Sequence, residues 1–446
     1  MRFTGPASAT IFALAWPMML RAIMLHGTVV IDAWLVAGLG EEAVAAMGLA
    51  TAFGGLLLGV LLAFSTATQI LAAKSFGTGR PEALRTALVC GLVINLGAGL
   101  AGLLATALVA GPMIEGSAHT PWIAAEARSY LAAFSIVVLG EAAAQSLSAH
   151  LNGCGETRRP FYSYLLAVPV NVGVSVVLIY GLLGAPALGV TGAAIGSGVS
   201  AVLRALYLGH HVRRANAAAL AASAWTQGSF PRALRDHLVF ALPVAATFLS
   251  ATVANTVCSL IYARLEITEF AALTLIAPWV QVAGTVGMAW AQAAGILVAQ
   301  LLGRGAGAGV LEDFLRQAWG GAVLAAAAVA AAYVGICASS GWIYGTLQAE
   351  TQAALWSFLP VLLLLPFPKG SNAICGNTLR AAGETVYVMH IFVWSQWLFR
   401  VPGTAALVWM GVPVAWVFSL LLFEELVKFP PFHQRMRGGR WKVAKL

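Results

Sequence analysis

The chain contains Leu151-Asn152-Gly153-Cys154-Gly155-Glu156-Thr157 and, in its second half, the similar stretch Leu379-Arg380-Ala381-Ala382-Gly383-Glu384-Thr385. A second match joins Trp16-Pro17 to Leu242-Pro243, and it has nearly the same spacing along the chain. Two matches at nearly the same spacing indicate an internal repeat. We therefore expect the chain to consist of two similar halves.

The composition excludes an ordinary soluble protein. Of the 446 residues, 60% are hydrophobic and only 9% are charged, whereas a soluble surface needs a much larger share of charge. The apolar runs are long enough to cross a bilayer, which takes about 20 residues per helix, and they lack the alternation of barrel strands. The sequence predicts twelve spans, at about residues 10–36, 46–73, 86–110, 122–149, 160–183, 187–211, 238–262, 270–300, 317–338, 352–378, 386–407 and 410–428.

These spans divide evenly between the halves. We predict an all-α membrane protein with twelve transmembrane helices in two pseudo-symmetric six-helix lobes. Residues 1–215 form the N-lobe, 216–236 a cytoplasmic linker, and 237–446 the C-lobe with a basic tail. Such a repeat is typical of a transporter whose substrate lies between its lobes. Pro17 and Pro243 predict a bend in the first helix of each lobe.

Basic residues gather on one side of the predicted membrane. If the N-terminus is cytoplasmic, the inner loops and tail hold 19 of the 25 basic residues, and the outer loops carry mostly acids. The inner basic residues are Arg2, Lys74, Arg80, Arg85, Arg158, Arg159, Arg213, Arg214, Arg232, Arg235, Arg304, Arg316, Arg380, Lys428, Arg435, Arg437, Arg440, Lys442 and Lys445. This asymmetry predicts that both termini are cytoplasmic. It also accounts for the net charge of +8 without a nucleic-acid partner.

The motifs of common enzymes are missing. The sequence has no HExxH, no GxSxG, no Walker lysine and no dinucleotide fingerprint. Its five cysteines are scattered, which argues against a metal site or a disulfide framework. We predict that the protein is not an enzyme, binds no cofactor or metal, and draws energy from an ion gradient.

Ionisable residues inside predicted spans are candidates for function, because burying a charge in a bilayer is costly. Asp32, in the first span, either reaches the outer membrane interface or lies inside the lobe and binds H⁺ or Na⁺. Asn171 in the fifth span, and Ser175 one turn later, could supply oxygen atoms to that ion. Ordinary hydrogen bonding between helices is the alternative role for both.

Three further residues are candidates for a substrate cavity. Glu141 in the fourth span either faces the cavity, where it would suit a cationic substrate, or pairs with a neighbouring residue. Ser197 could tune Asp32 or line the cavity. Lys369 lies in the tenth span, well away from either predicted end.

The order and spacing of these motifs resemble the multidrug and toxic compound extrusion (MATE) family of transporters, and within it the DinF-like branch. The resemblance rests on Pro17 and Asp32 in the first span, the stretch from Leu151 to Pro160, Asn171, and Leu379 to Thr385. It covers nearly the whole chain. It implies antiport of mostly cationic, amphipathic organic molecules against H⁺ or Na⁺, in a bacterial inner membrane.

The resemblance assigns the N-lobe coupling acid to Asp32 and the asparagine of the fifth helix to Asn171. The chain departs from the family pattern at Ser175, where many members carry a second acid or amide. It also departs at Ala251 and Lys369, where some members carry C-lobe acids. These differences favour coupling through Asp32, with H⁺ as the expected ion.

The sequence predicts an ion-coupled efflux antiporter that acts as a monomer and exports organic compounds, which are expected to be cationic. The alternative within the same superfamily is a flippase for a lipid-linked sugar, with Lys369 and Arg21 contacting a phosphate. A third possibility is a membrane protein that transports nothing, such as a receptor-like scaffold with a degenerate C-lobe.

Overall fold

The computed structural model describes residues 7–215, 217, 220, 224–343 and 349–442, and these are almost entirely helical. The chain divides into two compact units. We call Leu20–Ala245 the N-unit, and Met1–Met19 together with Ala246–Leu446 the C-unit.

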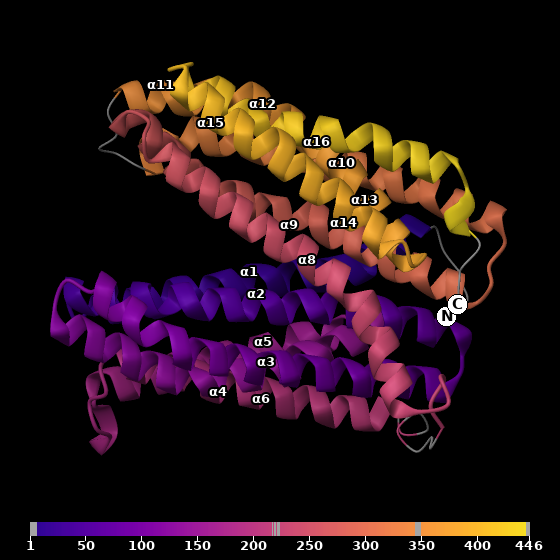
Figure 1. The fold of residues 1–446 in the computed structure, drawn as a ribbon, viewed down its shortest axis with the longest axis horizontal. Helices are drawn as coiled ribbons and strands as arrows, with labels where there is room; N and C mark the ends of the chain where they lie inside the picture. The colour runs from indigo at the N-terminus through magenta and orange to yellow at the C-terminus, as the bar shows by residue number, and fades with distance from the viewer. Residues whose placement is uncertain (1–6, 216, 218–219, 221–223, 344–348, 443–446) are drawn as a thin grey trace. The chain divides into compact units, whose positions relative to one another are not determined.

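The N-unit contains the six helices of the first half, and α2, α3, α4, α5 and α6 pack against one another (Figure 1). These are α1 (Ala7–Ala37, from Leu20 onward), α2 (Glu41–Thr78), α3 (Pro81–Ser117), α4 (Pro121–Gly153), α5 (Arg158–Tyr180) and α6 (Val190–Ala215), with a 3₁₀ turn, η1 (Leu182–Gly184), after α5. Local chemistry sets several of the helix ends. The Thr120 hydroxyl accepts a hydrogen bond from the Ile123 amide and caps α4, and Gly79 ends α2 in the left-handed conformation, with φ of 69°.

The C-unit contains the helices of the second half, several of them broken. They are α8 (Phe230–Tyr262, from Ala246 onward), α9 (Ile267–Gly303), α10 (Ala308–Ile343), α11 (Ala349–Ser357), α12 (Leu359–Leu364), α13 (Pro366–Ala381), α14 (Thr385–Trp394), the π-helix η2 (Ser395–Arg400), α15 (Val401–Trp409), α16 (Val414–Arg437) and η3 (Arg440–Lys442).

The helix bounds follow the repeat seen in the sequence. Helices α2 and α9 begin equally far after the matched prolines Pro17 and Pro243. Helix α4 and the series α11–α13 both end at the third residue of the repeated motif, and they begin equally far before it. Helices α6 and α16 both begin at a valine, Val190 and Val414. Aligned in this way, positions of α4 and α6 have counterparts in α11–α13 and α16.

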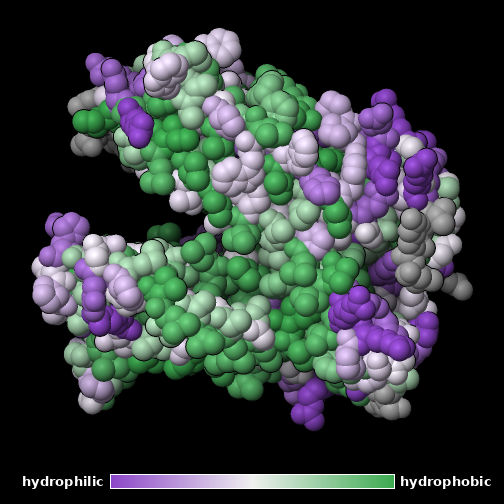
Figure 2. Space-filling view, in the orientation of Figure 1, coloured by the Kyte–Doolittle hydropathy of each residue, from purple (hydrophilic) through white to green (hydrophobic). Residues whose placement is uncertain are grey.

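The predicted all-α membrane class is confirmed. Nine described helices are long and apolar enough to cross a membrane, and α11–α12 with α13 form a tenth candidate bent by 43°. The two remaining predicted spans correspond to α14–η2–α15, which is broken into short pieces, and to α16, which carries Glu424, Glu425 and Lys428. Twelve spans are therefore consistent with the structure. Hydrophobic residues cover the sides of the helices in both units, and hydrophilic residues gather around their ends (Figure 2).

The compact units differ from the predicted lobes at the first helix of each half. The boundaries fall after Met19 and after Ala245, two residues beyond Pro17 and Pro243. Before its boundary, each helix packs with the other half: the Ala7 amide donates to Gln317 Oε1 (2.8 Å), and His237 Nε2 lies 3.1 Å from Thr68 Oγ1. Composition marks where a polar linker ends but cannot reveal this exchange. Part of the predicted linker (216, 218–219 and 221–223), with Arg2 and Lys445, lies outside the described residues.

Helices α5 and α6 approach closely because glycine lines their contact. A Cβ atom at Gly192 would lie 2.7 Å from the backbone nitrogen of Ile179 and 2.9 Å from the backbone oxygen of Leu178. Backbone atoms cannot move aside as a flexible side chain can, so this position requires glycine.

We therefore expect Gly192→Ala to destabilise the protein by about 1–3 kcal/mol through overpacking. Gly97→Ala is the matched control, because Gly97 is an exposed helix position in the same unit where an added Cβ would meet no atom within 4 Å. Thermal unfolding in detergent would measure both variants. Equal midpoints for the two would contradict the proposed contact.

Candidate functional site

Three polar side chains from different helices of the N-unit meet at Asp32. The Ser197 hydroxyl on α6 donates to Asp32 Oδ2 at 2.8 Å. Asn171 on α5 lies 2.9 Å from Ser197 Oγ. The structure thus brings together Asp32 and Asn171, predicted as partners, and adds Ser197, for which the sequence left two roles open.

The Asn171 amide forms the best set of hydrogen bonds when its nitrogen faces the Asp32 carboxylate. In that orientation Nδ2 donates to Asp32 Oδ1 at 3.1 Å, and the amide oxygen accepts from the Ser197 backbone nitrogen at 3.1 Å. The opposite orientation would face the amide oxygen towards the oxygens of the ionised carboxylate, which carry no proton to donate. Asp32 therefore receives one hydrogen bond on each carboxylate oxygen.

Ser175 is fully buried one turn beyond Asn171, but it is not bonded to Asp32. A Cβ atom at Gly196 would lie 2.2 Å from Ser175 Oγ and 3.1 Å from the Asn171 backbone oxygen. Ser175 therefore belongs to the close contact of α5 with α6. Its hydroxyl oxygen has no hydrogen-bond partner among the described residues.

The half-buried Asp32 side chain lies beside an apolar cluster and not beside a basic group. Its neighbours Ile31 and Ala33 pack against a core that includes Val36 and Phe134. Across residues 7–215, 217, 220, 224–343 and 349–442, no basic side chain forms an ion pair with Asp32. A carboxylate held only by neutral donors can take up a proton or a hard cation.

Glu141 forms an ion pair in the N-unit. Its carboxylate pairs with Arg204 on α6, and both side chains are at least nine-tenths buried. Gln145 Nε2 donates to Glu141 Oε2 at 3.1 Å, and the Arg204 guanidinium lies 3.6 Å from the centre of the Tyr164 ring. Of the two predicted roles for Glu141, the structure shows the pairing with a neighbour. The sequence analysis missed Arg204, because an arginine near the end of a predicted span is usually an interfacial residue.

The C-unit contains a buried network of charges that the sequence analysis also missed. Lys428 Nζ donates to Glu424 at 3.0 Å and to Glu425 at 2.7 Å, and Arg400 Nη1 donates to Glu424 at 3.3 Å. Asn372 Nδ2 donates to Glu425 Oε2 at 2.9 Å.

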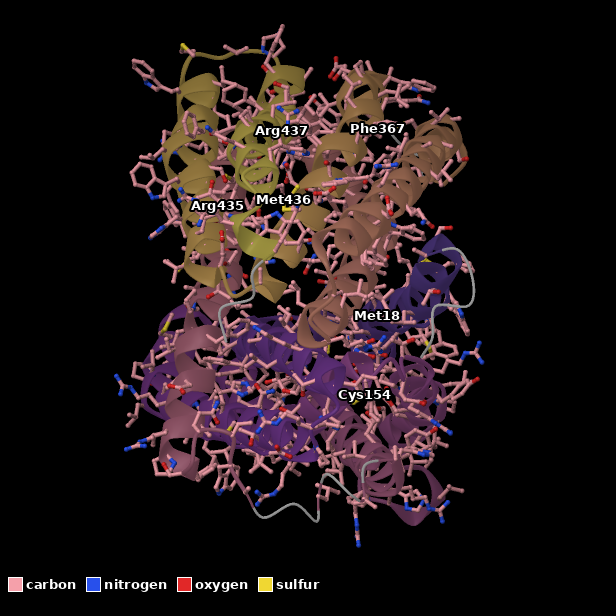
Figure 3. All side chains as sticks on the ribbon, turned by 90° about the vertical axis from the view of Figure 1, so that its right-hand side faces the viewer. Met18, Cys154, Phe367, Arg435, Met436 and Arg437 are labelled. Carbon is pink, nitrogen blue, oxygen red and sulfur yellow. The ribbon has the colours of Figure 1, made fainter. Side chains whose placement is uncertain are left out.

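Assigning Lys428 to the cytoplasmic tail was wrong. Helix α16 continues to Arg437, near the labelled Met436 (Figure 3), and the Lys428 side chain is only 3% exposed. The signal was available in the acids Glu424 and Glu425, which lie four and three residues before the lysine on the same helix face.

Lys369 lies on α13 and lines a pocket of the C-unit. Pro17 and Pro243 lie inside the continuous helices α1 and α8, and their role in bending stays a prediction. Next to Ala251, the position compared with the C-lobe acid of the seventh helix, Ser250 donates to Gln396 Oε1 at 2.8 Å and accepts from Trp397 Nε1 at 3.0 Å.

We expect removal of either partner of the Glu141–Arg204 pair to cost about 3–5 kcal/mol, because a buried charge is left without a partner. The double variant Glu141→Gln with Arg204→Gln should lose less than the sum of the two single losses. A double-mutant cycle on thermal stability measures this coupling, with the exposed pair Glu115–Arg128 as a control worth about 0–1 kcal/mol. Additive losses at 141 and 204 would show that the two side chains do not interact.

Comparison with known proteins gives one family and one fold. Residues 17–177 match the MatE family model. The chain is 26% identical over 422 residues to the probable multidrug resistance protein NorM of Bradyrhizobium diazoefficiens, covering 91% of this chain and 85% of that protein. It is also 26% identical over 313 residues to the protein of the same name from Rhizobium meliloti, covering 66% of each.

Solved structures share the fold over nearly the whole chain. A MATE transporter in the bent conformation has a TM-score of 0.85 at 18% identity, covering 98% of this chain and 97% of that one. The eukaryotic MATE transporter AtDTX14 has a TM-score of 0.84 at 17% identity, covering 98% and 96%. A superfamily transporter from Pyrococcus furiosus, described as having a binding pocket of reversed polarity, has a TM-score of 0.82 at 18% identity, covering 98% and 97%.

Proposed function

We propose that this chain, which matches the MatE family model over residues 17–177 and shares the fold of MATE transporters, exports organic compounds in exchange for an inward-moving ion that binds at Asp32. The cluster of Asp32, Ser197 and Asn171 carries this proposal. It joins helices α1, α5 and α6, so a change in the charge of Asp32 alters hydrogen bonds to two neighbouring helices. An ion that binds there can therefore change how these helices pack.

We propose that the ion is H⁺. A sodium ion needs several oxygen ligands, in the manner of other hard cations. The Asn171 amide presents nitrogen to the carboxylate, so among the described contacts Ser197 Oγ is the one side-chain oxygen added to those of Asp32. A proton needs a single oxygen, and the protonated acid can still accept hydrogen bonds from both neighbours.

The charges of the C-unit support coupling through the N-unit. The acids of the C-unit network are Glu424, which is buried, and Glu425, which is partly buried, and Lys428 and Arg400 already pair with them. Such a carboxylate would have to release a bound side-chain cation before it could take an ion from solution.

The remaining predictions become part of the proposal. The NorM relatives are bacterial and are described as probable multidrug resistance proteins, which supports a bacterial inner-membrane exporter of organic compounds. Basic residues such as Arg213, Arg214 and Arg437 at helix ends support cytoplasmic termini. We propose that the working form is a monomer. The cationic preference implied by the resemblance stays a prediction.

The exporter is favoured over the flippase. The flippase was supported by Arg21 and Lys369 as phosphate partners, but Arg21 Nη1 already donates to Ser148 Oγ at 3.2 Å in the N-unit. Loss of an envelope polymer in a deletion strain with normal drug tolerance would reverse this order.

We expect Asp32→Asn to abolish export driven by a pH gradient, because asparagine keeps the shape of the side chain but cannot bind and release a proton. Purified protein in liposomes would be tested with a fluorescent cationic dye and, separately, with a fluorescent anionic dye, under a pH gradient and then under a Na⁺ gradient. Glu42→Gln is the matched control, since Glu42 is an exposed acid of the same unit. Dye movement that persists unchanged in Asp32→Asn would remove the assignment of Asp32, and movement that follows Na⁺ alone would remove the choice of H⁺.

A further inference from the structure

The C-unit contains a pocket with a single charged residue in its lining. Helices α9, α10 and α13 contribute most of its walls. Its lining includes Met288, Val329, Tyr333, Leu365 and Lys369. We propose that this pocket binds amphipathic organic anions, with the Lys369 ammonium as the counter-ion of their acidic group. The proposal names a substrate class for the proposed exporter and rests on that function.

The first observation is that Lys369 lacks an ion-pair partner in a crowded network of charges. Around it lie two acids, Glu424 and Glu425, and two further cations, Arg400 and Lys428. Three basic side chains therefore share two carboxylates. Lys428 and Arg400 take the contacts at 2.7–3.3 Å, and within the described part of the chain no carboxylate lies within 4.0 Å of Lys369 Nζ.

The second observation comes from the repeat. Lys369 lies as far after the start of α11 as Glu141 lies after the start of α4, and Lys428 lies as far after the start of α16 as Arg204 lies after the start of α6. Lys369 is therefore the counterpart of Glu141, and Lys428 that of Arg204. Arg204 in the N-unit and Lys428 in the C-unit each lie over an aromatic ring. Arg204 is 3.6 Å from the ring centre of Tyr164, and Lys428 is 4.7 Å from that of Phe392.

In the N-unit, the acid on α4 neutralises this cation, so both charges are used inside the protein. In the C-unit, the corresponding position is a lysine, and Lys428 takes its carboxylates from its own helix. The repeat position that carries a negative charge in Glu141 therefore carries a positive charge in Lys369, and Lys369 lines a pocket.

The third observation is the apolar character of the walls. Met288, Val329 and Leu365 offer aliphatic surface, and the Tyr333 hydroxyl is turned to the Val280 carbonyl oxygen at 3.4 Å, which leaves its ring as an apolar wall. Small-molecule sites in proteins typically combine such mostly apolar walls with a small number of polar or charged groups that orient the ligand. A ligand that fits combines an apolar body with one negative group.

The energetics favour an anion over a cation. An ammonium in an apolar pocket without a counter-charge is costly, and an acidic ligand group removes that cost by forming a charge-assisted hydrogen bond. A cationic ligand would meet a like charge and would add to the cost.

Equilibrium binding to the full-length protein in nanodiscs tests the inference without any ion gradient. Three probes share one naphthalene body: 2-naphthoate, the neutral 2-naphthamide, and a naphthyl trimethylammonium salt. The parent should bind 2-naphthoate about tenfold or more tighter than the ammonium probe, the difference expected from one charge-assisted contact.

Lys369→Met should remove the preference for 2-naphthoate and leave binding of the neutral probe unchanged, which also shows that the pocket is intact. Lys369→Arg should keep the preference. Lys442→Met is the control, because Lys442 is a less buried lysine of the same unit and lies outside the pocket. This variant should bind all three probes as the parent does. A parent that binds the cationic probe as tightly as the anionic one, or a Lys369→Met variant with the parent's preference, overturns the proposal.

The readout separates this inference from the proposed function. Binding of 2-naphthoate that depends on Lys369, without gradient-driven transport of any probe, would refute the antiporter and keep the anion site. Dye export that needs Asp32, without a preference for the anionic probe, would keep the antiporter and refute the anion site.

Discussion

A charge buried in this helical protein is stabilised by a counter-charge or a polar partner, because the surrounding hydrocarbon supplies no water. In the N-unit, Glu141 pairs with Arg204 and bridges α4 and α6. In the C-unit, Glu424 binds both Lys428 and Arg400, which ties α16 to the π-helix η2. The positions of the buried charges therefore determine which helices lie together within each unit.

Close helix packing makes these contacts possible. Gly192 and Gly196 on α6 leave no room for a side chain against α5. This approach brings Ser197, the next residue along α6, within hydrogen-bond distance of Asn171 and Asp32. The Tyr180 hydroxyl donates to the Leu35 carbonyl oxygen at 2.7 Å and ties α5 to α1 one turn beyond the carboxylate. The small residues and the polar cluster therefore depend on each other. The glycines allow the close approach of α5 and α6, and this approach places hydrogen-bond donors beside the Asp32 carboxylate.

The two halves share helix bounds but not chemistry. Cys258 lies as far after Pro243 as Asp32 lies after Pro17, so the counterpart of the acid is a buried thiol, whose Sγ lies 3.8 Å from Thr404 Oγ1. The counterpart of Glu141 is Lys369. The N-unit therefore presents an acid held by neutral donors, and the C-unit presents a cation at a pocket. This division of chemistry is consistent with one half binding the ion and the other half contributing to substrate selection.

The helical class, the repeat and the candidate acid Asp32 could all be predicted from the sequence. Apolar length and the spacing of matched motifs depend only on neighbours along the chain, and an ionisable residue in a long apolar run stands out without a partner. The predictions for Ser197, Glu141 and Lys428 needed the tertiary structure, because each depends on a residue far away in the sequence or on how far a helix continues. The sequence left Glu141 between a cavity and a neighbour, and Arg204, 63 residues away, decided between them. Partner identity in a folded chain is set by which helix faces meet, and only the packed structure holds that information.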